Sequence, residues 1–239
     1  MVINAENLDY QTLNELVRSS QGSCEITHCR GQRFIAAGTP QRDIVIEGTP
    51  GNALGAYLNG AHITVRGNAQ DAVGDTMNDG VIVVHGSIGD TAGYAMRGGR
   101  IYVKGSAGYR AGIHMKAYRE KLPVMVIGET AGSFLGEYQA GGLIIVLDLS
   151  RSGKPIVSNF AGTGMHGGKM FLRSDCENIL FPPQVKTRPA AGEDIAEIEP
   201  YLREFCQYFG YEFDALASEP FTVVTPDSSN PYHQMYVEN

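Results

Sequence analysis

The sequence predicts an all-β solenoid: a right-handed parallel β-helix of about seven coils, with short helical caps at both ends. The first observation is a glycine that recurs every 19 residues, as Gly48, Gly67, Gly86 and Gly105. The second is another glycine seven residues after each of these, and the third is an alternation of apolar side chains before them. Glycine makes up 30 of 239 residues without a triplet period, and 43% of the residues are hydrophobic, which excludes collagen and disorder.

Each repeat contains one short strand that ends at the first glycine. The four clearest strands are Ile44–Gly48, Ile63–Gly67, Ile82–Gly86 and Ile101–Gly105. Because strand side chains alternate between two faces, the residues four and two positions before the glycine share one face, and they are isoleucine or valine in all four strands. Stacking them into columns buries side chains that contribute about 1.5–3 kcal/mol each. Right-handed winding follows from the general preference of parallel crossovers.

The opposite face of these strands is polar. The residue before each glycine is charged or histidine, namely Glu47, Arg66, His85 and Lys104. Neighbours in this ladder mostly differ in charge, as expected for side chains that stack on a solvated strand surface.

The period loosens in the later coils. The strand Val124–Gly128 follows its predecessor by 23 residues, Ile144–Asp148 follows by 20, and Met170–Ser174 follows by 26. We assign the extra residues to insertions around positions 117–123 and 151–160. Each insertion is expected to leave the stack of strands intact.

In these later strands both faces are apolar. We expect Val124 and Val126 to point inward, which leaves an outward column of Met125, Ile127, Ile145 and Leu147. An apolar column of this kind needs a cover. A helix near the C-terminus is the favoured cover, and a partner subunit is the alternative.

The open ends of a solenoid expose unpaired strand edges, so caps are expected there. We divide the chain into an N-terminal helical cap (1–21), the parallel β-helix (22–174) and an acidic C-terminal cap with one helix (175–239). The first helix is predicted at residues 9–19, with Asp9 as its N-cap. The second is predicted at residues 194–209, beginning near Glu199 because proline suits a first turn.

Charge and composition exclude several classes of protein. The net charge is −7, without a basic stripe, so nucleic acid is not an expected partner. No apolar run is long enough for a signal peptide or a membrane span. Four cysteines are too few for a disulfide scaffold, which favours the cytoplasm.

Two short motifs suggest chemistry. Gly162-Thr-Gly164-Met-His-Gly167 satisfies the dinucleotide pattern, but that pattern needs a following helix, and a strand is expected here. Cys24-Glu-Ile-Thr-His28-Cys29 resembles a thiolate and imidazole site. In an extended strand the two cysteines would point to opposite faces, so we interpret them as core or edge residues.

The histidines are scattered, at His28, His62, His85, His114, His166 and His233, without a carboxylate at triad or metal-motif spacing. The segment Gly108–Lys116 is rich in polar side chains and has two open interpretations, a surface facing a substrate channel or partner and an exposed coil edge. We assign no catalytic, cofactor-binding or metal-binding residue to this chain.

The glycine pattern resembles a known family. The segments that carry the resemblance are Gly48–Gly60, Gly67–Gly74, Gly93–Gly99 and Gly108–Gly112, and they are similar to the GXGXG domain of glutamate synthase. The resemblance covers about residues 22–174. The chain ending also resembles that of the stand-alone form of this domain, at Pro226, Asn230, Pro231, Tyr232 and Tyr236.

The resemblance implies a right-handed parallel β-helix without catalytic residues. Such a domain holds glutamine amidotransferase and FMN-containing synthase parts in register and helps to enclose the ammonia route between them. FMN and iron–sulfur clusters would then belong to partner subunits, and no cofactor would be bound here. The chain would be a subunit of an oxidoreductase complex that is not catalytic alone, because it lacks an N-terminal nucleophilic cysteine and a cysteine cluster.

Other assignments remain open. Formylmethanofuran dehydrogenase, a molybdenum or tungsten enzyme, contains a similar C subunit, and N-methylglutamate synthase-type enzymes use a similar subunit as well. A free-standing structural or binding β-helix is the remaining alternative. Self-association through the solenoid ends is also possible for an exposed strand edge.

Overall fold

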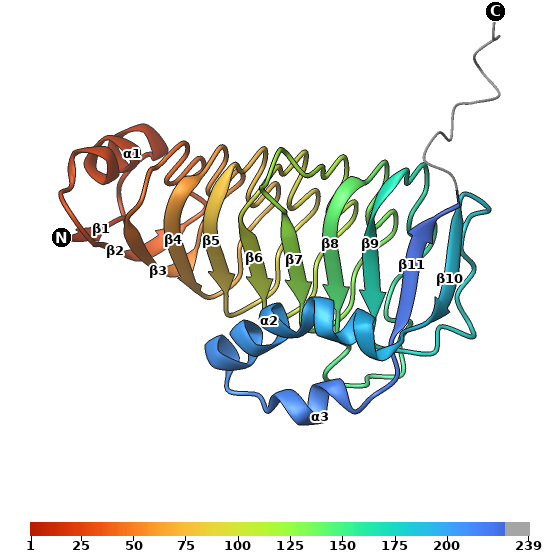
Figure 1. The fold of residues 1–239 in the computed structure, drawn as a ribbon. Helices are drawn as coiled ribbons and strands as arrows, with labels where there is room; N and C mark the ends of the chain where they lie inside the picture. The colour runs from red at the N-terminus through yellow and green to blue at the C-terminus, as the bar shows by residue number, and fades with distance from the viewer. Residues whose placement is uncertain (228–239) are drawn as a thin grey trace, which may run out of the picture.

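The computed structural model describes residues 1–227, and its backbone forms a right-handed parallel β-helix of about eight turns (Figure 1). Strands β1 to β9 pair in parallel in chain order, and β11 and β10 extend the same sheet in antiparallel fashion. The strands are β1 (Val2–Asn4), β2 (Cys24–Arg30), β3 (Asp43–Thr49), β4 (Asn59–Arg66), β5 (Asp79–Val84), β6 (Arg100–Val103), β7 (Val124–Ile127), β8 (Ala140–Val146), β9 (Gly167–Leu172), β10 (Val185–Pro189) and β11 (Thr222–Pro226).

The 19-residue repeat stacks as predicted. The register pairs Ile44 with Ile63, Ile63 with Ile82, and Ile82 with Ile101. All four side chains are at most 1% exposed and belong to one continuous core cluster inside the solenoid. The polar ladder outside is also present, since Arg66 and Glu47 form an ion pair of 2.9 Å across adjacent coils.

The two glycines of each coil serve different purposes. At the end of β3, Gly48 has a φ of 119°, and a Cβ there would collide with the backbone carbonyl oxygen of Cys29 in the preceding coil. Gly112 lies at the corner of a later coil with a φ of 71°, and a Cβ there would enter the core against the end of the Ile144 side chain. The first glycine therefore permits close stacking of backbones, and the second permits a left-handed corner over a filled core.

The fifth repeat corrects one sequence-based expectation. Ile101 pairs with Met125 and Val103 pairs with Ile127, so this coil is 24 residues long rather than 23. Met125 and Ile127 therefore point into the core, while Val124 and Val126 point outward. A one-residue slip in register exchanges every inward and outward side chain of a strand, which is why the expected faces were reversed here. For β8 the expected faces are confirmed.

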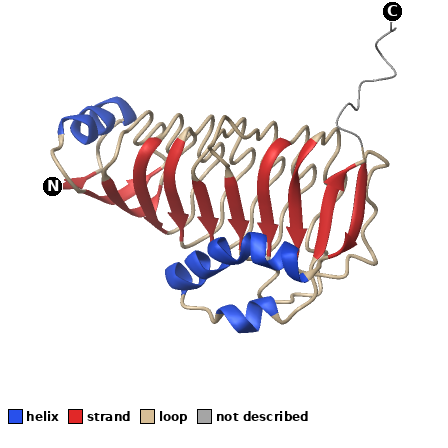
Figure 2. Cartoon of the chain, in the orientation of Figure 1, coloured by secondary structure: helices blue, strands red, loops and turns tan. Residues whose placement is uncertain are grey.

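The helix at the N-terminus is confirmed. Helix α1 (Tyr10–Ser19) is capped by Asp9, whose side chain accepts a 2.8 Å hydrogen bond from the Thr12 backbone N–H. Leu13 and Val17 are buried against the first coil. Figure 2 shows this helix at the end of the solenoid where the chain begins.

The C-terminal helix covers the outward apolar column, as favoured from the sequence. Helix α2 (Gly192–Phe209) lies across the sheet, and the short helix α3 (Phe213–Ala217) follows it (Figure 1). The buried outward residues and the helix residues form a second apolar cluster, whose fully buried members are Tyr102, Val126, Ile145, Leu147, Phe171, Ile198, Leu202, Phe205 and Val223.

Two details of this segment differ from expectation. Helix α2 begins at Gly192 rather than near Glu199, so Pro200 lies in its interior. Burial of Ile198 and Leu202 on the sheet compensates for the backbone hydrogen bond that proline removes. The segment also contains a second helix and two strands, and it is β11 and β10, rather than a helix, that follow β9 at the end of the sheet.

The start of α2 is held by a charged pair. Both terminal guanidinium nitrogens of Arg188 donate to the Asp194 carboxylate, at 2.6 and 2.8 Å, and the Ala191 backbone N–H donates to it as well. These hydrogen bonds, that of Arg188 above all, lower the pKa of Asp194 from 3.8 to about 2. The carboxylate itself is only 3% exposed.

Replacing Asp194 with asparagine is expected to lower the free energy of unfolding at pH 7 by about 1–2 kcal/mol, allowing for the half-exposed Arg188. The folded pKa lies below the unfolded value, so this contribution is present above about pH 4 and is lost as the pH falls toward 2. Urea unfolding between pH 7 and pH 2 should show the two stability curves converging. The Glu199→Gln variant, which breaks the exposed Arg203–Glu199 pair, should change little. A gap between wild type and Asp194→Asn that stays constant with pH would contradict this role.

Candidate interaction surfaces

The corners of the solenoid carry aromatic side chains over four coils, in two rows of ring contacts. From Gly55 onward, each corner has left-handed residues two positions before and two positions after its central glycine. In the later coils these flanking positions hold large side chains, and Tyr94 and Tyr109 pack beside them. We call this surface the aromatic ridge, and its members are Tyr94, Tyr109, His114, Phe134, Tyr138 and Phe160.

The ridge is built from ring contacts between successive coils. The His114 and Tyr138 rings stack with centroids 5.1 Å apart and planes 9° apart. Phe134 packs between Tyr109 at 5.3 Å and Phe160 at 5.0 Å. Such contacts contribute about 0.5–1.5 kcal/mol each beyond simple burial.

One arginine is part of the ridge. The Arg110 guanidinium lies 4.9 Å from the centre of the Tyr109 ring and 5.4 Å from that of Phe134. Its Nε is 2.7 Å from Oε2 of Glu137, whose side chain is only 9% exposed. The ion pair holds Arg110 beside the rings, so this cation is already neutralised within the chain.

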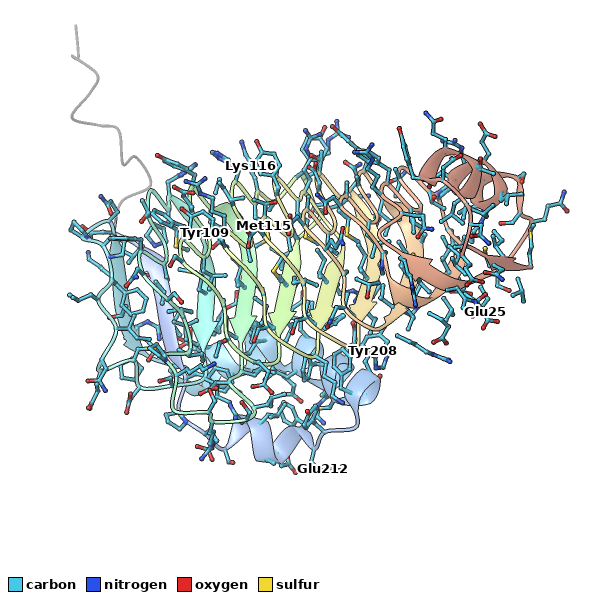
Figure 3. The ribbon with its side chains drawn as sticks, turned by 180° about the vertical axis from the view of Figure 1, so that it is seen from behind. Glu25, Tyr109, Met115, Lys116, Tyr208 and Glu212 are labelled. Carbon is cyan, nitrogen blue, oxygen red and sulfur yellow. The ribbon has the colours of Figure 1, made fainter. Side chains whose placement is uncertain are left out.

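Three further cations follow ridge residues closely in the sequence. Arg97 and Lys116 occupy equivalent positions in adjacent coils, shortly after Tyr94 and His114. Arg119 lies in the insertion before β7, with its guanidinium 5.2 Å from the centre of the Tyr118 ring. All three are exposed. Within residues 1–227 none of them forms an ion pair with a carboxylate. We call Arg97, Lys116 and Arg119 the cationic rim. Figure 3 shows Tyr109 and Lys116 on the side of the solenoid away from Tyr208 and Glu212.

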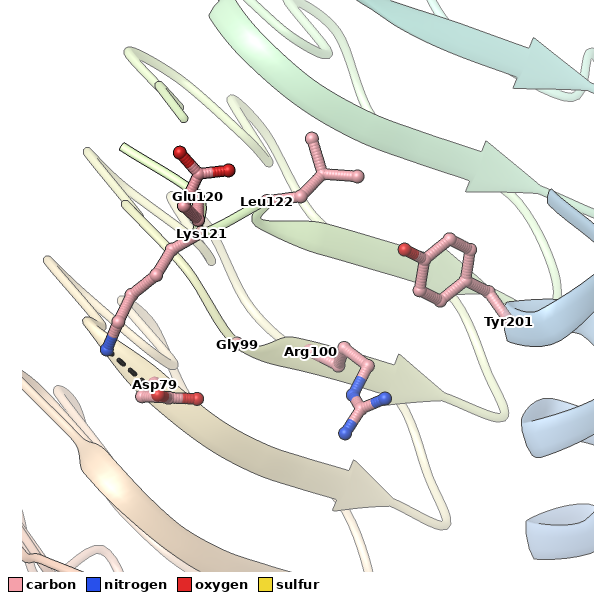
Figure 4. Close-up of a pocket in the computed structure, with 7 residues that line it drawn as sticks. All are labelled: Asp79, Gly99, Arg100, Glu120, Lys121, Leu122 and Tyr201. Atoms are coloured by element: carbon pink, nitrogen blue, oxygen red, sulfur yellow. Dashed lines mark hydrogen bonds and ion pairs between the residues drawn. The ribbon is translucent and has the colours of Figure 1, made fainter. Parts of the chain in front are cut away.

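A polar cleft of about 320 Å³ lies between the insertion and α2 (Figure 4). It is lined by Asp79, Gly99, Arg100, Glu120, Lys121, Leu122 and Tyr201. Lys121 pairs with Asp79 at 2.8 Å, and Arg100 pairs with Glu204 at 2.8 Å. The hydrogen bond from Lys121 lowers the pKa of Asp79, so this carboxylate is ionised at neutral pH. The cleft therefore offers paired charges suited to binding a polar group, and its aspartate is a poor general acid.

The cysteine motif is part of the core. Cys24 and Cys29 are both at most 2% exposed, because an irregularity in β2 between Ile26 and Cys29 returns the second cysteine to the interior. They do not point to opposite faces as the strand pattern predicted, but their interpretation as core residues is confirmed. Burial raises the pKa of Cys29 to about 11, so this thiol is protonated at neutral pH.

The described histidines lie apart from one another. His62 and His85 pack edge-on against Tyr208 and Phe209 of α2, at 5.8 and 5.2 Å. His114 is in the ridge, and His166 Nδ1 is 3.1 Å from the Gly164 carbonyl oxygen. His28 lies at the irregularity in β2. His233 and the terminal residues that resemble the stand-alone form, 230–236, lie outside the described residues.

The glycine motif at residues 162–167 is a corner followed by strand β9, as expected from the sequence. Across residues 1–227 no group of three or more His, Cys, Asp or Glu side chains is arranged to hold a metal ion. Over the same range no helix is both long and apolar enough to cross a bilayer.

Sequence reasoning singled out Gly108–Lys116 and missed the rest of the ridge. The structure places Tyr109, Arg110 and His114 of that segment in the ridge, on an exposed edge of the coil. Its interpretation as a surface that faces a substrate channel or partner stays a prediction. The signal that could have revealed the ridge is the corner glycine, because Gly112, Gly136 and Gly162 mark equivalent corners although they are unequally spaced in the sequence. Aligning on these glycines would have brought Arg110, Phe134 and Phe160 into one column.

Comparison with known proteins identifies a family, and the similar chains include the two described here. The family model described as GXGXG motif matches residues 12–226. An uncharacterized protein of Methanocaldococcus jannaschii is 41% identical over 250 residues, covering 99% of this chain and 96% of that protein. A chain of the formyltransferase/hydrolase complex from Methylorubrum extorquens, solved with methylofuran, has a TM-score of 0.60 and 20% identity. That match covers 90% of this chain and 87% of the other, and it shows a shared fold.

Proposed function

The chain belongs to the GXGXG motif family, and from this premise we propose that it is a non-catalytic structural subunit of a glutamate synthase-type complex. In this role it holds a glutamine amidotransferase and an FMN-containing synthase in register and helps to enclose an ammonia route between them. The observation that carries the proposal is the glycine corner repeated at Gly55, Gly74, Gly93, Gly112, Gly136 and Gly162. The corners at Gly55, Gly74, Gly93 and Gly112 lie within the segments that resemble the glutamate synthase domain.

The interior of the solenoid is filled with side chains, which suits a role as a rigid spacer between subunits. The columns inside the solenoid consist of large apolar side chains with no exposed surface, among them Ile63, Met77, Ile82, Met96, Ile101 and Met115. Close packing of this kind makes a stiff rod. Under the proposal, ammonia passes along the outside of this chain, between it and the partner subunits, rather than through the solenoid.

The donor set of this chain does not suit an iron–sulfur cluster. Such a cluster takes four cysteine thiolates, whereas the four cysteines here are buried thiols that divide between the two apolar clusters. Burial raises the pKa of each of them. We therefore assign iron–sulfur clusters to the partner subunits, and under the proposal FMN belongs to the synthase subunit.

The second candidate is the equivalent subunit of a formylmethanofuran dehydrogenase-like complex. The observation that favours it is the fold shared with a chain of the Methylorubrum formyltransferase/hydrolase complex, which extends over nine-tenths of this chain. Both candidates make this chain one component of a multi-subunit enzyme. Genes encoding amidotransferase and FMN synthase proteins beside this one would favour the first, and genes for a molybdopterin or tungstopterin dehydrogenase would favour the second.

The biochemical test is reconstitution with and without this chain. We expect it to copurify with the amidotransferase and FMN synthase subunits of the same organism. Omitting it should lower glutamine-dependent formation of glutamate from 2-oxoglutarate by at least about tenfold, because linked sites act at high effective concentration. Glutamate formation from added ammonia should fall much less, since that reaction does not need the amidotransferase. Equal glutamine-dependent activity without this chain would refute the proposal.

A further inference from the structure

The aromatic ridge contains bulky residues in an unfavourable backbone conformation. Arg110, His114, Phe134, Tyr138 and Phe160 all have positive φ, between 53° and 64°. Residues with a Cβ are disfavoured there, at about 1–2 kcal/mol each, and glycine adopts the same conformation without strain. In the four coils before these, six of the eight flanking corner positions hold small residues, namely Gly38, Ala53, Ala72, Thr76, Thr91 and Ala95, and the other two hold Phe34 and Tyr57. The strained large side chains are thus concentrated in the later coils.

Contacts within the chain leave part of this surface uncovered. Among the strained residues, Phe160 is 55% exposed and His114 is exposed, whereas Phe134 and Tyr138 are half-buried by other ridge residues. Tyr94 and Tyr109 have ordinary backbone conformations and are 41% and 37% exposed. Clusters of exposed aromatic and arginine side chains are typical of the centres of protein–protein interfaces. Backbone strain combined with solvent exposure, as at His114 and Phe160, indicates a role for these side chains outside the isolated chain.

The charges at the ridge specify the chemistry of its partner. Arg110 is neutralised by Glu137, but the three cations of the rim have no carboxylate partner within the described residues. A complementary surface therefore presents carboxylates to Arg97, Lys116 and Arg119 and apolar side chains to the rings.

The shape of the ridge favours a macromolecule over a small ligand. It crosses four coils, and three steps at the usual strand spacing give a length of about 14 Å. Its side chains project from corners of the solenoid, and none of them lines the polar cleft beside α2. A small ligand needs an enclosing site, whereas a protein surface can bury such a row.

We propose that the aromatic ridge, with its cationic rim, is the docking surface for a protein subunit that presents carboxylates around an apolar patch. The inference rests on the proposed function, in which this chain binds the amidotransferase and synthase subunits. It adds which face of the solenoid they use: the corner face, with α2 and the sheet that it covers left free of this contact.

The test uses glycine substitutions that remove side chains while relieving strain. In the Phe134→Gly, Phe160→Gly double variant two rings are lost at positions with φ of 61° and 64°. The melting temperature should change by no more than a few degrees, because the strain that glycine relieves is similar in size to the ring contacts that are lost. Affinity for the amidotransferase and synthase subunits, measured by analytical ultracentrifugation, should fall at least about tenfold.

The matched control is Tyr57→Gly. Tyr57 is 57% exposed and has a φ of 56°, so it also flanks a corner glycine, on the opposite side, and has the same strain, but it lies two coils before the first residue of the ridge. Its variant should bind the partner subunits as the unaltered chain does. A second variant, Arg97→Ala with Lys116→Ala, should slow association and flatten its dependence on salt.

The outcomes separate the two proposals. If the unaltered chain binds the subunits and the phenylalanine double variant binds equally well, the docking surface is wrong while the proposed function stands. If the unaltered chain binds neither subunit, both fail. If the unaltered chain forms a dimer that the double variant cannot form, a second copy of this chain occupies the ridge and the proposed partner is wrong.

Discussion

The Gly48→Ala variant is expected to lose about 3–5 kcal/mol of unfolding free energy. A Cβ at this position collides with the Cys29 carbonyl oxygen of the preceding coil, and the φ of 119° is one that alanine rarely adopts. Backbone strain contributes about 1–3 kcal/mol and the displacement of a stacked coil contributes a similar amount. Urea unfolding followed by circular dichroism measures the loss.

Gly38→Ala is the matched control. Gly38 also has a positive φ, of 67°, but a Cβ there meets no atom within 4 Å. Only backbone strain remains, so the loss should be about 1–2 kcal/mol. Equal losses in the two variants would contradict the assignment of Gly48 to close backbone stacking.

The Phe205→Ala variant should release α2 from the sheet. Phe205 is fully buried in the outer apolar cluster, beside Phe209 at 4.7 Å, and its truncation is expected to lower stability by about 3–5 kcal/mol. The cluster inside the solenoid consists of other residues, so the coils should stay folded when the helix detaches. Hydrogen exchange should show faster exchange in α2 with protection retained in β4 and β5.

Gln207→Ala tests whether the effect depends on burial. Gln207 is exposed on the same helix turn, and its truncation should change stability by less than about 0.5 kcal/mol. Retained protection of α2 in Phe205→Ala would show that the outer cluster does not hold the helix. Loss of protection throughout β4 and β5 would show that the two clusters unfold together.

The chain has two outward-facing apolar surfaces, and only one of them is covered by another part of the described chain. Tyr102, Val126 and Ile145 are covered by α2, and Tyr102 also donates a 2.5 Å hydrogen bond to Glu204 of that helix. The ridge residues Tyr109 and Phe160 have no such cover within the described chain. The covered surface completes the fold, and the uncovered one is the surface that we assign to a partner.

The errors of sequence reasoning have identifiable causes. Val124 and Val126 were expected inside because they stand at the expected distances before Gly128, but the insertion before β7 is one residue longer than that spacing implied. Residues 124–127 are all apolar, so hydrophobic alternation could not reveal the slip. Pro200 suggested a late start for α2, whereas burial of the turns on both sides of it decided the observed start.

The sequence by itself determined the solenoid, its coil length and the Ile44–Ile101 columns, because a period of 19 residues with glycine at two fixed offsets leaves only one way to stack the strands. Tertiary structure decided which side chains meet between coils of unequal length. Phe134 and Phe160 are 26 residues apart in sequence and 5.0 Å apart in space, and α2 folds back over strands about 100 residues earlier, as the contact of Arg100 with Glu204 shows. Such contacts depend on how insertions are accommodated and on which apolar faces pair, and these are properties of packing rather than of any local pattern.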